Sequence, residues 1–153
     1  GRYESAWYRR TNESQDPAVS WIFDGVEGDI FGDYGHNSGG AAGYELDRAD
    51  ARLGTPDGAI VIARSDGLQA GFLPLMEDMR FPPQALSGED AGTLVRGDMT
   101  YFETEGGGAV FAASSISFNG SLWQNGAFGG PVSRILENVV RRFSRDPSEP
   151  IAG

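Results

Sequence analysis

Apolar residues recur at helical spacing near the end of the chain. Between residues 131 and 143 they fall at i, i+3, i+4, i+7, i+8 and i+11, at Val132, Ile135, Leu136, Val139, Val140 and Phe143. This spacing forms one apolar stripe and predicts an amphipathic α-helix over residues 131–143. Pro131 suits the first helical turn, where no amide donor is needed. Glu137 and Arg141 are spaced for a favourable ion pair, and a frayed tail is expected over residues 144–153.

Shorter apolar runs predict strands. Residues 59–63 are a continuous run rich in β-branched side chains, which is typical of a strand covered on both faces. Residues 99–104 and 109–114 flank a glycine-rich turn at 105–108, which predicts a β-hairpin. Residues 19–23 form a further apolar run, and we expect a strand there as well.

Other segments lack a clear period. Residues 28–43 and 115–131 are rich in glycine and predict two long, shaped loops. Residues 1–17 mix aromatic and charged side chains and predict an extended arm that lies on another surface. Residues 49–56 predict a short helical turn, and residues 73–79 fit either a short strand or a helix. The pattern as a whole predicts an α/β or α+β fold with a mixed sheet.

Length and composition narrow the class of protein. The 153 residues are enough for a single domain over 1–153 with its own core. The net charge is −10 and the 12 basic residues are all Arg, which disfavours nucleic acid as a partner. The chain has no Cys and one His, so thiolate chemistry and a multi-His metal centre are excluded. No apolar run reaches the roughly 20 residues of a membrane span, and cytoplasmic localisation is the default expectation.

The clearest candidate chemistry lies in residues 39–48. Small residues end at Gly43 and are followed at once by Tyr44, Glu45, Asp47 and Arg48. A carboxylate beside a glycine-rich turn can serve as a general base or a metal ligand. It can equally form a structural ion pair with the nearby guanidinium, and the residues alone favour that ion pair.

Other candidates carry less specific signals. His36 is the only imidazole and could carry protons, although a lone loop histidine is more often simply exposed. Ser114, Ser115, Ser117 and Ser121 offer hydroxyl groups. No nucleophile elbow accompanies them, so the serine hydrolase hypothesis is weak.

Two stretches together resemble a known family. "GGAAGYELDR…LGTP…AIVIARS" is followed by "DMTYFETEGGGAVFAASSISFNGSL…VSRILENVVRRF". In order and spacing they resemble the C-terminal domain of the large (beta) subunit of N,N-dimethylformamidase and its relatives, over roughly residues 1–143. The hairpin and final helix are also similar to the end of class I glutamine-amidotransferase-like domains.

The dimethylformamidase resemblance implies an iron-dependent amidohydrolase that splits N-substituted formamides into formate and an amine. It implies iron held by two tyrosines and a glutamate outside this chain, so no metal ligand is expected here. It further implies that Glu45 is an active-site carboxylate near the metal-bound water, acting as general base. Tyr44, Asp47 and Arg48 would then orient Glu45, and His36 would relay protons.

The resemblance also bears on substrate and partners. Where the family has a Trp-Cys pair, this chain has Phe118 and Asn119, and these residues with Trp123 are candidates to line the substrate channel. The expected partners are the rest of the large subunit and a small amide substrate. The resemblance also suggests a small subunit as a partner and assembly into a homo-oligomer. The rival hypothesis is a non-catalytic structural or sugar-related domain in which Glu45 and Arg48 form an ion pair.

Overall fold

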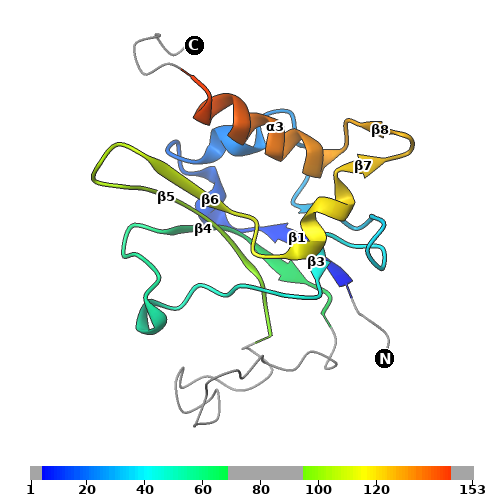
Figure 1. The fold of residues 1–153 in the computed structure, drawn as a ribbon, viewed down its shortest axis with the longest axis horizontal. Helices are drawn as coiled ribbons and strands as arrows, with labels where there is room; N and C mark the ends of the chain where they lie inside the picture. The colour runs from blue at the N-terminus through cyan, green and yellow to red at the C-terminus, as the bar shows by residue number, and fades with distance from the viewer. Residues whose placement is uncertain (1–4, 69–94, 146–153) are drawn as a thin grey trace.

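The computed structural model describes residues 5–68 and 95–145, which form a six-stranded β-sheet, a small two-stranded sheet of β7 and β8, short 3-10 helices and a single α-helix (Figure 1). In chain order the elements are β1 (Ser5–Arg10), the 3-10 helices η1 (Asn12–Gln15) and η2 (Ser20–Phe23), β2 (Ile30–Phe31), β3 (Ala42–Gly43), η3 (Ala51–Leu53), β4 (Ile60–Asp66), β5 (Asp98–Glu103), β6 (Ala109–Ala112), η4 (Ile116–Ser121), β7 (Trp123–Gln124), β8 (Ala127–Phe128) and α3 (Pro131–Phe143). The described helices include none long and apolar enough to cross a membrane.

The sheet has the strand order β2-β1-β4-β5-β6, and β3 also pairs with β1. Every strand pair in the described part of the chain is antiparallel. The expected combination of sheet and helix is therefore confirmed as α+β, while the expectation of a mixed sheet is corrected to an antiparallel one. The hairpin is confirmed, because β5 and β6 pair from Glu103↔Ala109 to Thr100↔Ala112. The likeness to glutamine-amidotransferase-like domains stays an expectation.

Strand β1 lies inside the sheet, which differs from the expected arm. Ala6 and Tyr8 are buried and alternate with the more exposed Trp7 and Arg9, the two-residue period of a half-buried strand. Arg9 pairs with Asp66 on β4 at 2.7 Å. Arg9 thus stands on the outer face, whereas Arg10 lies over the ring of the buried Phe23, at 4.3 Å from its centroid. The charge of these two residues concealed a strand.

Residues 19–23 were expected to form a strand, and this prediction is wrong. The backbone carbonyl of Asp16 accepts bonds from the amides of Val19 (2.9 Å) and Ser20 (2.8 Å), and η2 continues the helical turn. Ile22 and Phe23 are both buried. A short continuous apolar run does not by itself distinguish a strand from a buried helical turn.

The two glycine-rich loops contain more regular structure than expected. Residues 28–43 begin and end with the short strands β2 and β3, and residues 115–131 contain η4, β7 and β8. Gly40 shows one reason for the glycines, because a Cβ atom there would collide with the carbonyl oxygen of Ala6 on β1. The close approach of the two backbones therefore requires glycine before β3.

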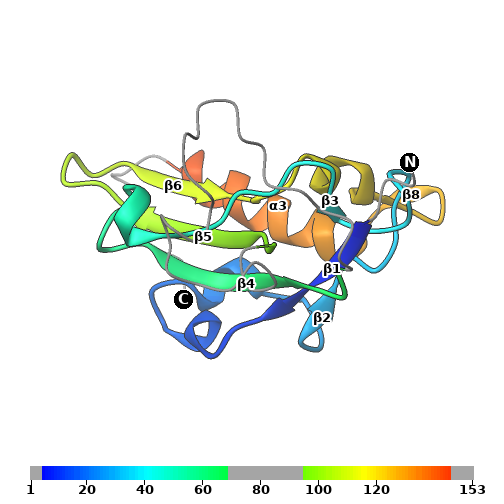
Figure 2. The same cartoon turned by 90° about the horizontal axis from the view of Figure 1, so that it is seen from below.

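Helix α3 has the predicted bounds and covers one face of the sheet (Figure 2). Val132, Ile135 and Val139 are buried in the core. The side-chain amide of Asn138 donates to the carbonyls of Ile22 (3.0 Å) and Asp24 (2.9 Å), which joins α3 to η2. The core therefore lies between the sheet on one side and α3 with η2 on the other.

The remaining local predictions have mixed outcomes. The helical turn expected in residues 49–56 is confirmed as η3, and the Glu137–Arg141 pair is present at 2.8 Å. The segment at residues 73–79 lies outside the described residues, as does most of the expected tail.

Candidate functional site

The candidate carboxylate stands on a sharp turn directly after β3. Tyr44 has φ 61°, a left-handed conformation that is an outlier for a bulky side chain and costs about 1–3 kcal/mol. The Tyr44 side chain is 41% exposed, and the adjacent Glu45 is exposed as well. Glu45 has no hydrogen bond or ion pair with any residue in the described ranges 5–68 and 95–145. The backbone is held in an unusual shape while the carboxylate faces outward.

Ser115 fastens this turn from the other side. Its hydroxyl accepts a hydrogen bond from the Gly43 amide at 2.9 Å and donates one to the Gly43 carbonyl at 2.8 Å. Leu46 forms an antiparallel bridge with Ser115, and the Asp47 amide donates to the Ser114 carbonyl at 2.8 Å. The chain on both sides of Tyr44 and Glu45 is therefore tied to the segment that follows β6.

The buried residue Asp98 holds the chain just after the turn through two further hydrogen bonds. The Asp98 amide donates to the Asp47 carbonyl at 2.9 Å, and the Asp98 side chain accepts from the Ala49 amide at 2.9 Å. The guanidinium groups of Arg64 and Arg96 lie 3.2 and 3.1 Å from the Asp98 carboxylate, whose side chain is 1% exposed. A buried charge needs such compensation, so we assign Asp98 a structural role in holding residues 47–49.

Tyr8 anchors the same region from the core. Its hydroxyl donates to the Ala113 carbonyl at 2.8 Å and lies 3.0 Å from the Ser114 hydroxyl. Burial raises the pKa of Tyr8 to about 12, and the nearby hydroxyl groups of Ser114 and Ser115 only partly oppose that effect. Tyr8 therefore stays protonated at neutral pH and acts as a fixed support beneath Ser114, not as a base.

The expected ion pair between Glu45 and Arg48 is replaced by another. In the described part of the chain, Arg48 Nη2 lies 3.0 Å from Asp50 Oδ2. Burial acts to raise the pKa of Asp50, but hydrogen bonds from Arg52 and the charges of Arg52 and Arg48 outweigh it, and the pKa lies below its ordinary value. Asp50 also caps η3 by accepting from the Arg52 amide. The rival hypothesis thus loses the ion pair on which it rested.

The other candidate residues differ in how far they are exposed. His36 is exposed, and its amide donates to the Gly120 carbonyl of η4 at 3.0 Å. Asn119 is exposed on η4, and Trp123 is 42% exposed and packs edge-on against Phe128. Phe118 is 3% exposed and contacts Phe111 in the core, which leaves it little surface to offer a substrate.

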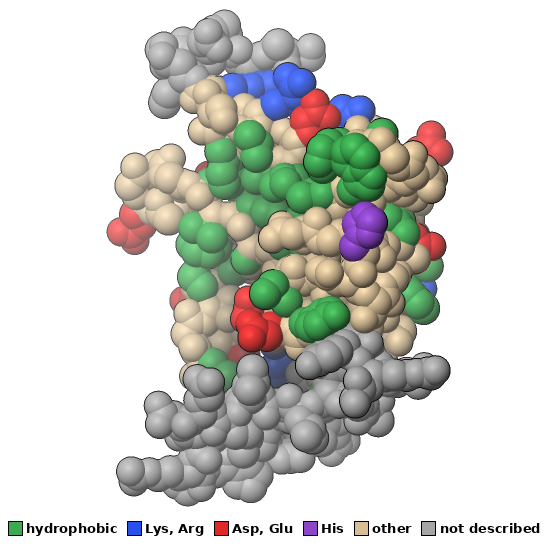
Figure 3. Space-filling view, turned by 45° about the vertical axis from the view of Figure 1, so that its right-hand side comes forward, with side chains coloured by type: hydrophobic (Ala, Val, Ile, Leu, Met, Phe, Trp, Pro, Cys, Tyr) green, Lys and Arg blue, Asp and Glu red, His purple; other side chains and the backbone are tan. Residues whose placement is uncertain are grey.

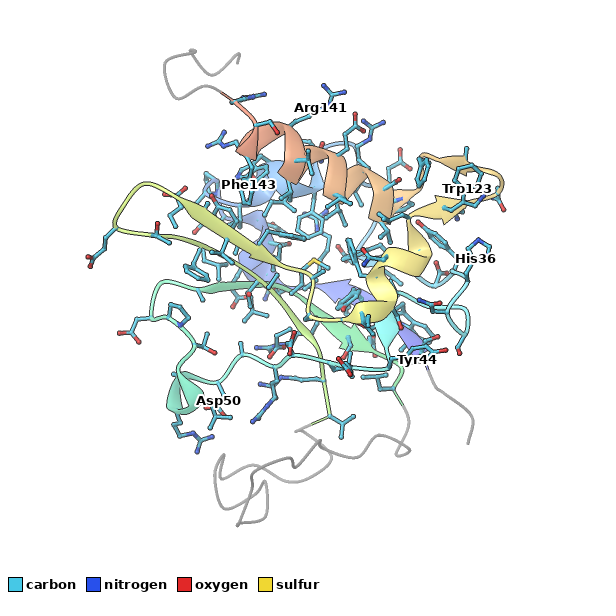
Figure 4. All side chains as sticks on the ribbon, viewed as in Figure 1. His36, Tyr44, Asp50, Trp123, Arg141 and Phe143 are labelled. Atoms are coloured by element: carbon cyan, nitrogen blue, oxygen red, sulfur yellow. The ribbon has the colours of Figure 1, made fainter. Side chains whose placement is uncertain are left out.

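Tyr44, His36 and Trp123 lie along one edge of the molecule (Figure 4). Figure 3 shows the face that bears His36, the sole histidine, with apolar side chains near it. Asp47 is exposed beside the turn. The structure thus presents one edge with an aromatic hydroxyl, an imidazole and an indole, while Phe118 belongs to the interior.

The described residues contain no group of three or more His, Asp or Glu side chains that could hold a metal ion. What this part of the chain offers is a carboxylate on a fastened turn.

Sequence reasoning missed the residues that support this turn. Tyr8 had been assigned to an arm, and Asp98 was not considered. Ser114 and Ser115 were weighed only as nucleophiles. A signal was present for Ser115, because serine is preferred just before a helical turn, and Ser115 accepts from the Ser117 amide at the start of η4.

The fold and site define an α+β domain with an antiparallel sheet and an exposed carboxylate on a strained turn at its edge. The chain belongs to the family described as N,N-dimethylformamidase beta subunit-like, C-terminal, which matches residues 1–128. It is 40% identical over 149 residues to the N,N-dimethylformamidase beta subunit of Paracoccus aminophilus, and 39% identical over 147 residues to that of Alcaligenes sp. These matches cover 96% and 95% of this chain, which spans only 19% of the length of each relative.

Proposed function

We propose that this chain supplies Glu45 as general base to a dimethylformamidase-like hydrolase that splits N-substituted formamides or similar small amides into an acid and an amine. Two relatives are named as beta subunits of N,N-dimethylformamidase. Because the chain corresponds to about a fifth of such a subunit, the rest of the site would come from other parts of the protein. Any iron would be held there too.

One observation carries the proposal for Glu45. The carboxylate is exposed and without a hydrogen-bond or ion-pair partner in the described ranges, although its backbone is fastened at Gly43 and Asp47. A structural carboxylate would be expected to form an ion pair with a neighbouring side chain, as Asp50 and Asp98 do. A group held in place but left unpaired is suited to accept a proton from a substrate or a water molecule.

The chemistry then follows the ordinary course of amide hydrolysis. Glu45 accepts a proton from the attacking water as the water oxygen bonds to the carbonyl carbon. The C–N bond breaks, and the proton passes to the leaving amine nitrogen. Tyr44, Asp47 and Arg48 would set the orientation of Glu45, and His36 on the same edge would move protons to and from solvent.

The test is Glu45→Gln in the full-length enzyme, which keeps the shape of the side chain and removes its basicity. We expect kcat for N,N-dimethylformamide and N-methylformamide to fall roughly 100- to 10,000-fold. Glu105→Gln, at an exposed position in the β5–β6 turn, is the matched control and should retain normal turnover. If Glu45→Gln folds and turns over like the parent enzyme, the assignment of Glu45 as base is wrong.

A further inference from the structure

We propose that Ser115 is a positioning residue for Glu45, an inference that rests on the proposed function of Glu45. Ser115 would act through the backbone of Gly43 and not by contact with the reacting atoms. It holds the backbone from which Glu45 projects, and so sets where the carboxylate stands. Figure 1 shows β3 beside the start of η4, the place where this contact is made.

The hydroxyl of Ser115 uses its full hydrogen-bonding capacity. It donates to the Gly43 carbonyl (2.8 Å) and accepts from the amides of Gly43 (2.9 Å) and Ser117 (3.1 Å). A serine hydroxyl has one proton and two lone pairs, so these three bonds satisfy it completely. Two of the three go to the residue directly before Tyr44.

The turn needs such a hold because its conformation is unfavourable by itself. Tyr44 adopts φ 61°, and a bulky residue remains in that region only where its surroundings determine the backbone. Gly43 is buried on one side of Tyr44, and Ser115 binds both of its backbone polar groups. Loss of the hydroxyl would leave these groups without that partner and let the turn relax.

Ser115 is in turn fixed by its neighbours. The Leu46–Ser115 bridge and the bond from the Asp47 amide to the Ser114 carbonyl connect the far side of the turn to the same segment. The Tyr8 hydroxyl bonds to the Ala113 carbonyl and lies 3.0 Å from the Ser114 hydroxyl. Ser115 therefore transmits the rigidity of the core to a turn at the surface.

Ser115→Ala in the full-length enzyme tests the role. We expect kcat to fall roughly 10- to 100-fold, because a displacement of about 1 Å costs that much when a catalytic group moves, with KM changing far less. Ser115→Thr keeps the hydroxyl and should restore most of the turnover. Ser115→Cys, a milder variant with a weaker donor, should fall between the two and serves if Ser115→Ala fails to fold.

Ser14→Ala is the matched control. Ser14 is buried, and its hydroxyl donates to the Thr11 carbonyl at 2.7 Å and accepts from Arg10 at 3.2 Å, away from the turn. This variant should lower the melting temperature but leave kcat unchanged. If Ser115→Ala and Ser14→Ala lower kcat equally, Ser115 acts only through general stability and the proposal is overturned.

A double mutant and amide hydrogen exchange distinguish the role of Ser115 from the role of Glu45 as base. If Ser115 acts through Glu45, adding Ser115→Ala to Glu45→Gln should cost little more than Glu45→Gln alone; fully additive losses overturn it. Amide exchange over residues 41–48 should speed up roughly 3- to 10-fold in Ser115→Ala, and unchanged exchange also overturns it. Faster exchange together with normal turnover in Glu45→Gln would reject the proposed base while leaving the hold of Ser115 on the turn in place.

Discussion

At the scale of single residues, the carboxylates near the turn divide by whether their charge is compensated. Asp98 is buried and faces Arg64 and Arg96, and Asp50 faces Arg48 and Arg52. Glu45 is exposed and has no such partner in the described ranges. The compensated carboxylates shape the backbone of this region, and the exposure of Glu45 agrees with the role proposed for it.

Tyr8 offers a measurable consequence at this scale. Its pKa is about 12 in the folded chain, against an ordinary value of 10.0. The folded state therefore holds a proton that the unfolded state releases, so this contribution to stability is complete below pH 10 and is lost as the pH rises towards 12. Tyr8→Phe removes that dependence along with the bonds to Ala113 and Ser114.

The measurement is the free energy of unfolding of the 153-residue chain in urea at several pH values. At neutral pH we expect Tyr8→Phe to be less stable by about 1–3 kcal/mol, because it leaves buried polar groups without a partner. Between pH 10 and 12 the parent chain should lose stability more steeply than Tyr8→Phe. Equal slopes for the two chains would contradict the assigned cause of the pKa shift.

At the scale of elements, the sequence predicted correctly those helices and strands whose signals are local. The helix at residues 131–143 and the hairpin of β5 and β6 were predicted correctly, because a stripe of apolar residues and a glycine turn are local signals. Residues 19–23 became η2, and the apparent arm became β1. The strand β1 depends on pairing with β4, which is distant in the chain, so no local pattern contains it. The bonds of the Asp16 carbonyl to Val19 and Ser20 are local, but a short apolar run fits a strand and a helical turn equally well.

The same distinction applies to the candidate site. Glu45 was found from a compact polar cluster and a family resemblance, while its support by Ser115 joins positions 72 residues apart. The proposed pairing of Glu45 with Arg48 used the nearest opposite charge in the sequence. The fold instead directs Arg48 to Asp50, a choice set by backbone geometry rather than by spacing.

Two adjacent valines test the orientation of α3. Val139 is 4% exposed and faces the sheet, whereas Val140 is 53% exposed. Val139→Ala should destabilise the chain by about 1.5–3 kcal/mol, since it removes buried apolar contacts and leaves a cavity. Val140→Ala should change stability by less than about 0.5 kcal/mol. Urea unfolding of both variants measures the difference, and equal losses would show that the helix presents another face.

At the scale of the whole molecule, the chain combines a closed interior with an edge rich in exposed aromatic groups. Within the described parts of the chain, sixteen buried apolar residues form one core cluster, whereas Trp123 and Phe128 on the β7–β8 hairpin are 42% and 70% exposed. The chain also spans only 19% of the length of its relatives. This balance agrees with the proposal that the chain forms its own core and that other parts of the protein complete the site.

A shared site predicts that the 153-residue chain is inactive by itself. We expect no release of formate from N,N-dimethylformamide or N-methylformamide by the chain alone. The full-length enzyme assayed in parallel should release formate, because the groups that complete the site would lie outside this chain. Turnover by the chain alone, at a rate abolished by Glu45→Gln, would show instead that the chain holds a complete site.

The tip of the β5–β6 hairpin provides a practical handle on this protein. A Cβ atom at Gly106 would meet no other atom within 4 Å, and the chain contains no cysteine of its own. A cysteine introduced there would give the chain a single thiol for a dye or spin label. Such a label would report the surroundings of the hairpin tip without a chemical change at the Glu45 turn.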